Sequence, residues 1–196
     1  MTVLGVMLGV SVVAGMGGHA PQTPAAPQPQ TQKPPVNPDA KALADFNERV
    51  KKYLELHNRL EATLPSLPDQ SDPKRIRDHQ AGFAKLIADA RAGARPGDIF
   101  TPPVRKIFRR VIRNVLRGPG GREIRAEILD ENTKPVPLRV NGQYPSDVPL
   151  SSVPPGILDA LPRLPEDLEY RFVERQLILF DNHAQMIADY MTNALP

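Results

Sequence analysis

The stretch LEYRFVERQLILFD, residues 168–181, decides the fold class of this chain. Apolar and polar side chains alternate on both sides of Glu174-Arg175, and a period of two is typical of strands with one buried face. If Glu174 and Arg175 form the turn, the two halves pair in a consistent register, with polar and apolar residues mixed on the other face. The predicted pairs on the apolar face are Phe172 with Leu177 and Tyr170 with Leu179. The stretch therefore predicts an antiparallel β-hairpin.

The flanking segments predict less regular structure. Beyond Asp181, the apolar residues at 184, 187, 188 and 191 have helical spacing, so we expect a short C-terminal helix capped by Asp181. Before the hairpin, alternation over 136–140 favours a strand, but Pro137 restricts it to a sheet edge. Asn141-Gly142 indicates a tight turn, and a helical turn is expected over 156–161.

The region 39–132 predicts helices. Asn37-Pro38 and Asp72-Pro73 are helix starts, and each is followed by an apolar stripe with alternating spacings of three and four. The short connection between the two helices favours an antiparallel helical hairpin. Further helices are expected after Thr101-Pro102 and over 122–131. The predicted class is α+β, mainly α: a helical hairpin and a third, basic helix packed with a small antiparallel sheet and a short C-terminal helix.

The N-terminal part of the chain predicts export. Residues 1–20 carry no Lys, Arg, Asp or Glu and contain an apolar run too short to span a bilayer, as in a secretory signal. Seven of the 18 residues in 21–38 are Pro, which indicates a disordered linker. A single domain over 39–196 follows, with helices over 39–132 and the sheet and last helix over 133–196. We expect a periplasmic or secreted protein.

The third helix predicts a contact surface. Residues 102–125 hold eight basic side chains against Glu123 alone, whereas residues 126–196 hold five basic and eleven acidic ones. Two interpretations remain open: the helix pairs with the acidic third, or it docks on a protein partner or an anionic membrane surface. Nucleic acid is disfavoured, because interleaved aromatic residues are missing. The residues expected to make the contact are Arg105, Lys106, Arg109, Arg110, Arg113 and Arg117.

Two histidines suggest an alternative role in metal binding. In an antiparallel hairpin His57 and His79 would lie at the same height on the inward stripes, with Glu61 or Asp78 as a possible third ligand. Each imidazole could equally be satisfied within a helix interface. The chain has no Cys, which excludes disulfides, thiolate metal sites and Cys nucleophiles.

The motifs GDIFTP at 97–102, VNGQYP at 140–145 and the 168–190 stretch carry a resemblance. Over roughly 40–196 the chain resembles a family of uncharacterised exported bacterial proteins, which implies export and brings no activity. The final hairpin is more loosely similar to small envelope modules and to the periplasmic nickel/cobalt-homeostasis hairpin. No functional residue carries over from either resemblance.

No catalytic set emerges from the sequence. There is no nucleophile elbow, and Asp181 with His183 reads first as a helix-start aspartate beside a solvated histidine. We therefore expect a non-catalytic envelope protein without a cofactor. The alternative is a metal-binding protein or enzyme with a site near His57 and His79.

Overall fold

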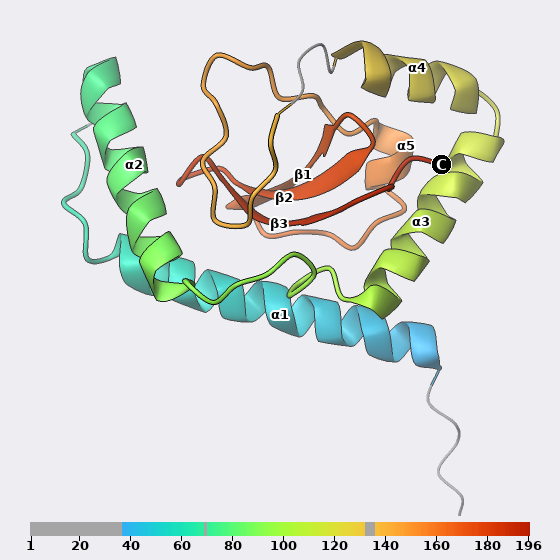
Figure 1. The fold of residues 1–196 in the computed structure, drawn as a ribbon, viewed down its shortest axis with the longest axis horizontal. Coiled ribbons are helices and arrows are strands. Elements are labelled where there is room, and N and C mark those ends of the chain that lie inside the picture. The colour runs from blue at the N-terminus through green and yellow to red at the C-terminus, as the bar shows by residue number, and fades with distance from the viewer. Residues whose placement is uncertain (1–36, 69, 132–135) are drawn as a thin grey trace, which may run out of the picture. The chain divides into compact units, whose positions relative to one another are not determined.

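The computed structural model describes residues 37–68, 70–131 and 136–196. The predicted signal segment 1–20 and most of the predicted linker lie outside these residues. Figure 1 shows the helices arranged around a small sheet. The helices are α1 (Pro38–Glu61), α2 (Pro73–Ala90), α3 (Pro102–Arg117), α4 (Gly121–Glu131) and α5 (Pro155–Leu158), and the strands are β1 (Leu168–Val173), β2 (Gln176–Asp181) and β3 (Met186–Met191). The predicted class, α+β and mainly α, is confirmed.

The helices begin where the sequence predicts. The side chain of Asn37 accepts a hydrogen bond from the Asp39 amide, and that of Asp72 accepts one from the Arg75 amide, so each satisfies a free N–H at a helix start. Proline occupies the first position of α1, α2 and α3, where its missing N–H costs nothing. None of the helices in the described part of the chain combines the length and the apolar composition needed to cross a bilayer.

The sheet is an antiparallel meander in the order β1-β2-β3. The predicted hairpin register is confirmed, with Phe172 opposite Leu177 and Tyr170 opposite Leu179. The turn is the two residues Glu174 and Arg175, and Glu174 adopts a positive φ of 52° as tight hairpin turns require.

The predicted C-terminal helix is wrong, because residues 186–191 form β3. Five of its six residues are buried, since one face meets the main core and the other is covered by the segment that contains Tyr144. A strand covered on both faces loses the polar alternation that identifies strands in a sequence. A bulge between Leu179 and Phe180 on β2 adds to the irregularity, with Ala188 as the extra residue on β3.

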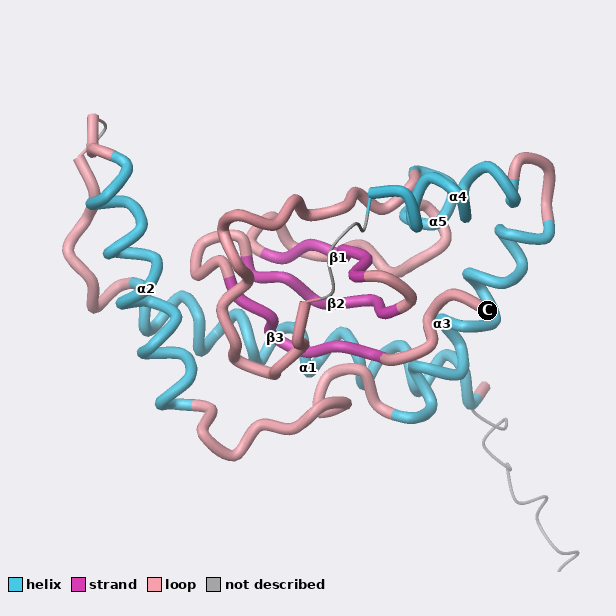
Figure 2. Tube along the Cα trace, turned by 45° about the horizontal axis from the view of Figure 1, so that its top comes forward, coloured by secondary structure: helices cyan, strands magenta, loops and turns pink. Residues whose placement is uncertain are grey.

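The predicted edge strand over 136–140 does not form within the described residues. Instead, the stretch around Asn141–Tyr144 makes backbone hydrogen bonds to Gln185 and Ile187 beside β3, and only a single bridge, Gln143 with Met186, is present. Tyr144 packs edge-to-face on Phe180 in the small second core. Figure 2 shows this loop crossing the face of the sheet.

The main core lies between the other face of the sheet and helices α1 and α3. An aromatic cluster joins one residue from each part: Phe46 of α1, Phe100 of the connecting loop, Phe108 of α3 and Tyr170 of β1, with ring centroids 5.3 to 6.5 Å apart. Phe46 and Tyr170 both pack on Phe100 and Phe108, so these aromatic contacts connect α1 to the sheet at this point.

Helix α2 does not lie along α1 as a hairpin partner. Both views show it standing steeply on α1, and its buried residues Phe83, Ala84 and Ile87 all belong to its second half. In the first half Ile76 is 38 % exposed. His79 is not among the buried residues of α2, so the two histidines do not face each other from buried stripes as expected.

Candidate metal centre

The site is built on the last turns of α1. His57 and Glu61 are four residues apart, so they lie on one helix face, where side chains meet one turn apart. His57 is fully buried, whereas the side chain of Glu61 is 35 % exposed. The pair thus runs from the core to the surface along the helix that packs under the sheet.

The end of β2 supplies the partner of His57. The Oδ2 atom of Asp181 lies 2.7 Å from His57 Nδ1 and also accepts a 2.7 Å hydrogen bond from the Tyr53 hydroxyl. The Oδ1 atom accepts from the backbone amides of His183 and Ala184. Asp181 therefore orients the imidazole and, with the same carboxylate, folds the turn that carries His183.

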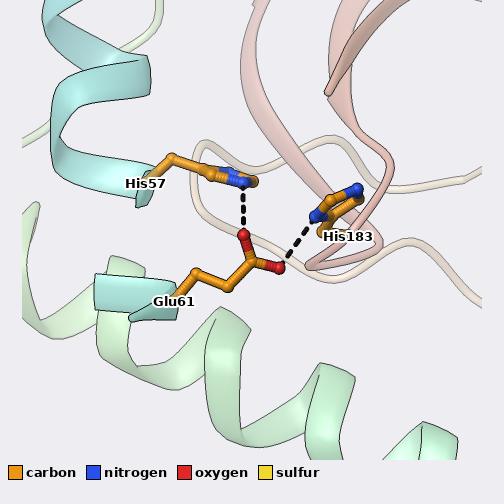
Figure 3. Close-up of side chains that lie close together, drawn as sticks. All are labelled: His57, Glu61 and His183. Carbon is orange, nitrogen blue, oxygen red and sulfur yellow. Dashed lines mark hydrogen bonds and ion pairs between the residues drawn. The ribbon is translucent and has the colours of Figure 1, made fainter. Parts of the chain in front are cut away.

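His183 comes from the β2–β3 turn and faces Glu61. Its Nδ1 lies 2.8 Å from Glu61 Oε1, and its Nε2 lies 3.6 Å from Asp167 Oδ1. Figure 3 shows both imidazoles pointing toward the one glutamate carboxylate. The ring centroids of His57 and His183 are 5.4 Å apart.

The other nitrogen of His57 has no hydrogen-bond partner. Its Nε2 atom is buried and makes no hydrogen bond to any described residue, although Glu61 Oε2 is 3.4 Å away. An unsatisfied buried polar atom is costly and uncommon in folded proteins. The ring cannot turn away to find a partner, because Nδ1 is held by Asp181 and Phe83 packs edge-to-face at 4.8 Å.

Ligand atoms of His57, Glu61 and His183 all lie within 4.8 Å of one another. Two ligands bound tetrahedrally to Zn²⁺ at about 2.0–2.1 Å stand about 3.4 Å apart, which is the separation between His57 Nε2 and Glu61 Oε2. Asp181 is hydrogen-bonded to the other nitrogen of His57, the arrangement that supports a histidine ligand, and Asp167 lies 3.6 Å from the other nitrogen of His183. The residues fit a divalent transition metal.

Electrostatics around His57 also favour a cation. Burial lowers the pKa of the imidazole, but the hydrogen bond to Asp181 and the charges of Asp181, Glu61 and Asp167 outweigh it, so the pKa lies above its usual value. Burial, followed by the charge and hydrogen bond of Asp181, raises the pKa of Tyr53 well above its usual value. A positive charge between the carboxylates is stabilised, whether it is a proton or a metal ion.

A hydrolytic triad does not fit these residues. The Asp181–His57 pair resembles the orienting half of such a triad, but Nε2 faces a carboxylate instead of a hydroxyl. The ring is also fully buried, so a substrate has no access to it.

His79 is not part of the cluster. It lines a surface hollow of about 530 Å³ together with Glu61 and Asn58, and Asp78 pairs with Lys74 instead. The second histidine of the cluster is His183 and not His79. The signal available in the sequence was the His57–Glu61 spacing together with the closeness of His183 to Asp181.

Two of the six basic residues predicted to form a contact surface on α3 bind other residues of the chain. Its apolar residues Val104, Ile107, Phe108 and Ile112 are buried in the core, so the helix cannot also insert them into a membrane. Arg109 donates to the carbonyls of Thr192 and Asn193, and Arg110 pairs with Asp39. The role of the six basic residues in binding a partner stays a prediction.

Comparisons with family models, with curated proteins and with solved structures find no match for this chain. The resemblance to exported bacterial proteins and the predicted export therefore stay predictions.

Proposed function

We propose that this protein binds a divalent transition metal, with zinc as the best fit, through His57 Nε2, a carboxylate oxygen of Glu61 and His183 Nδ1. The observation that carries the proposal is the buried Nε2 atom of His57, which forms no hydrogen bond with any residue that the structure describes and lies 3.4 Å from Glu61 Oε2. A metal ion would satisfy this nitrogen and bring the two imidazoles and the carboxylate together.

The three ligands differ in their exposure to solvent. His57 is preset by Asp181 and Phe83 in the core, while Glu61 and His183 are about one third and one half exposed. Metal therefore reaches the site from the surface side, between Glu61 and His183. Three protein ligands leave a position for water or an external ligand on a tetrahedral ion.

The test is zinc titration of the purified, metal-free full chain by calorimetry with a competing chelator. We expect one zinc ion per chain and a melting temperature that rises with zinc concentration, because the metal binds only the folded state. His183→Ala and Glu61→Gln alter exposed ligands and should weaken binding by about tenfold or more.

The matched control is His79→Ala, which removes a neighbouring imidazole that is outside the cluster and should leave the affinity unchanged. The proposal fails if wild-type protein binds no stoichiometric zinc, or if His183→Ala and His79→Ala weaken binding equally. Because the ligand variants are at partly exposed positions, their folding can be verified by circular dichroism before titration.

A further inference from the structure

A second concentration of charge lies at the corner between α3 and α4, away from the residues of the metal site. Four arginines line a cavity of about 270 Å³: Arg113 and Arg117 from the end of α3, and Arg122 and Arg125 from the start of α4. Leu116, Gly121 and Pro196 complete the lining. Two helices thus contribute two arginines each to the lining of one hollow.

Gly121 fixes this corner. A Cβ atom at this position would lie 2.1 Å from the Leu116 carbonyl oxygen, so only glycine allows the start of α4 to approach α3 so closely. Gly120, with a φ of 74°, makes the turn that reverses the chain. This close approach brings the end of α3 next to the start of α4, and arginines of both helices line the cavity there.

The four arginines differ from the other basic residues of α3. Arg109 and Arg110 are engaged with backbone carbonyls and with Asp39, as described above. In contrast, Arg113, Arg117, Arg122 and Arg125 form no ion pair with any residue that the structure describes. The nearest acid in sequence is Glu123, which does not line the cavity.

The parts of the chain that the structure does not describe contain little acidic charge that could balance these arginines. Their sequence contains a single acidic residue, Asp69. Among the described residues no Asp or Glu side chain lines the cavity, so its four positively charged side chains repel one another, and an anion that enters the cavity relieves the repulsion. Guanidinium groups bind phosphate oxygens in pairs, which makes clustered arginines typical of phosphate recognition.

We propose that this cavity binds a phosphate group, carried either by a soluble compound or by a lipid headgroup. The proposal does not depend on the metal site. It narrows the broad basic surface expected from the sequence to four arginines, of which Arg122 and Arg125 lie outside the predicted set. The apolar face of α3 is buried, so contact with a lipid would be through the headgroup alone.

The test uses inorganic pyrophosphate as the probe in calorimetric titrations of the full chain at low ionic strength. We expect saturable binding that weakens with salt, and a loss of about tenfold or more in the Arg117→Gln/Arg122→Gln variant, because charge-assisted hydrogen bonds are removed. Arg113→Gln/Arg125→Gln provides an independent pair if the first variant folds poorly.

The matched control is Arg75→Gln/Arg77→Gln, which removes the same net charge from the exposed half of α2. It should change the affinity less than about twofold, as a remote surface change does. Equal losses in the two double variants, or no saturable binding by wild-type protein, would overturn the proposal.

A vesicle arm identifies the source of the phosphate. The full chain is co-sedimented with phosphatidylglycerol vesicles and with phosphatidylcholine vesicles, with and without pyrophosphate. Binding to phosphatidylglycerol that pyrophosphate displaces supports a headgroup ligand at this cavity. Pyrophosphate binding without vesicle binding supports a soluble phosphate compound. Vesicle binding that is unchanged in Arg117→Gln/Arg122→Gln contradicts a headgroup site here.

Discussion

Two buried aspartates at the sheet have similar burial and opposite surroundings. Asp189 of β3 accepts hydrogen bonds from the backbone amides of Gly97, Ile99, Phe100 and Tyr190. Asp181 of β2 accepts from two backbone amides but also holds the side chains of Tyr53 and His57. Asp189 therefore fixes a loop, whereas Asp181 connects the fold to an imidazole whose other nitrogen forms no hydrogen bond with any described residue and lies 3.4 Å from Glu61 Oε2.

Burial of a charged side chain does not by itself identify a functional residue. The partners of Asp189 are all main-chain donors, so its role ends with the GDIF loop at 97–100. The partners of Asp181 include an imidazole whose other nitrogen faces two exposed ligand groups. The two aspartates differ in what their hydrogen-bond partners contact in turn: the imidazole bound to Asp181 has a second nitrogen close to Glu61.

The largest effect on stability is expected at Asp189. Asp189→Asn removes the negative charge and replaces one acceptor oxygen with a donor that faces amide donors, so we expect a loss of at least about 3 kcal/mol in the free energy of unfolding. Urea denaturation measures it. Zinc affinity under native conditions should stay at the wild-type value, and a large loss of affinity would contradict the separation of the two roles.

Asp181→Asn should have its main effect on zinc affinity, whereas Asp189→Asn affects mainly stability. An asparagine has one acceptor oxygen for two sets of donors, and its amide can donate to His57 Nδ1, which moves the imidazole proton to Nε2 and blocks the metal ligand. We expect zinc affinity to fall by about 10–100-fold, as with other residues that support histidine ligands.

Calorimetry with a competing chelator measures this change beside Asp189→Asn as the control. An Asp181→Asn variant that loses stability but keeps wild-type zinc affinity would contradict the role of Asp181 in supporting His57 as a metal ligand.

The metal-free protein should lose stability as the pH rises. Asp181, Glu61, Asp167, Tyr53 and His183 surround His57, and the raised pKa of its imidazole means that the folded state holds the proton more tightly than the unfolded chain. This contribution is fully present below the unfolded pKa of about 6.5 and is lost as the pH rises through the higher folded value.

Unfolding measurements in chelator across this range, on wild type and His57→Gln, isolate the contribution. Stability of wild type relative to His57→Gln that increases with pH would contradict the assignment. Stabilisation by added zinc should show the opposite trend, because the metal binds unprotonated imidazole.

The smallest effect is expected on the stability of the metal-free His183→Ala variant. The side chain of His183 is 48 % exposed, so its pairing with Glu61 should contribute within about 0.5 kcal/mol. His79→Ala should be equally mild. Thermal denaturation in chelator measures both, and a change of several degrees for His183→Ala would mean that the exposed imidazole serves the fold instead of a ligand.

Sequence patterns predicted the elements whose determinants are local. The hairpin register followed from a period of two around Glu174-Arg175, and the starts of α1 and α2 from Asn or Asp followed by Pro, because these depend on residues a few positions apart. The strand at 186–191 was missed, because its second face is covered by a segment some forty residues earlier in the chain.

The residues of the candidate cluster were predicted in part. His57 and the possible participation of Glu61 were recognised, since both lie on the stripe or beside it in α1. The second histidine was wrong, because its choice depended on α2 lying along α1, and only the second half of α2 packs there. The hydrogen bonds of Asp181 decide that His183 faces Glu61, and no local pattern encodes that contact.

Local patterns were sufficient to predict the α+β class, the hairpin pairing and the concentration of arginines over 102–125, because periodicity, capping and composition act within short stretches of chain. Three features depend on the folded arrangement: the different partners of Asp181 and Asp189, the contact of His183 with Glu61, and the four arginines that line one cavity beside Gly121. Such an arrangement depends on how separate elements pack, and packing is set by long-range contacts that a local pattern does not contain.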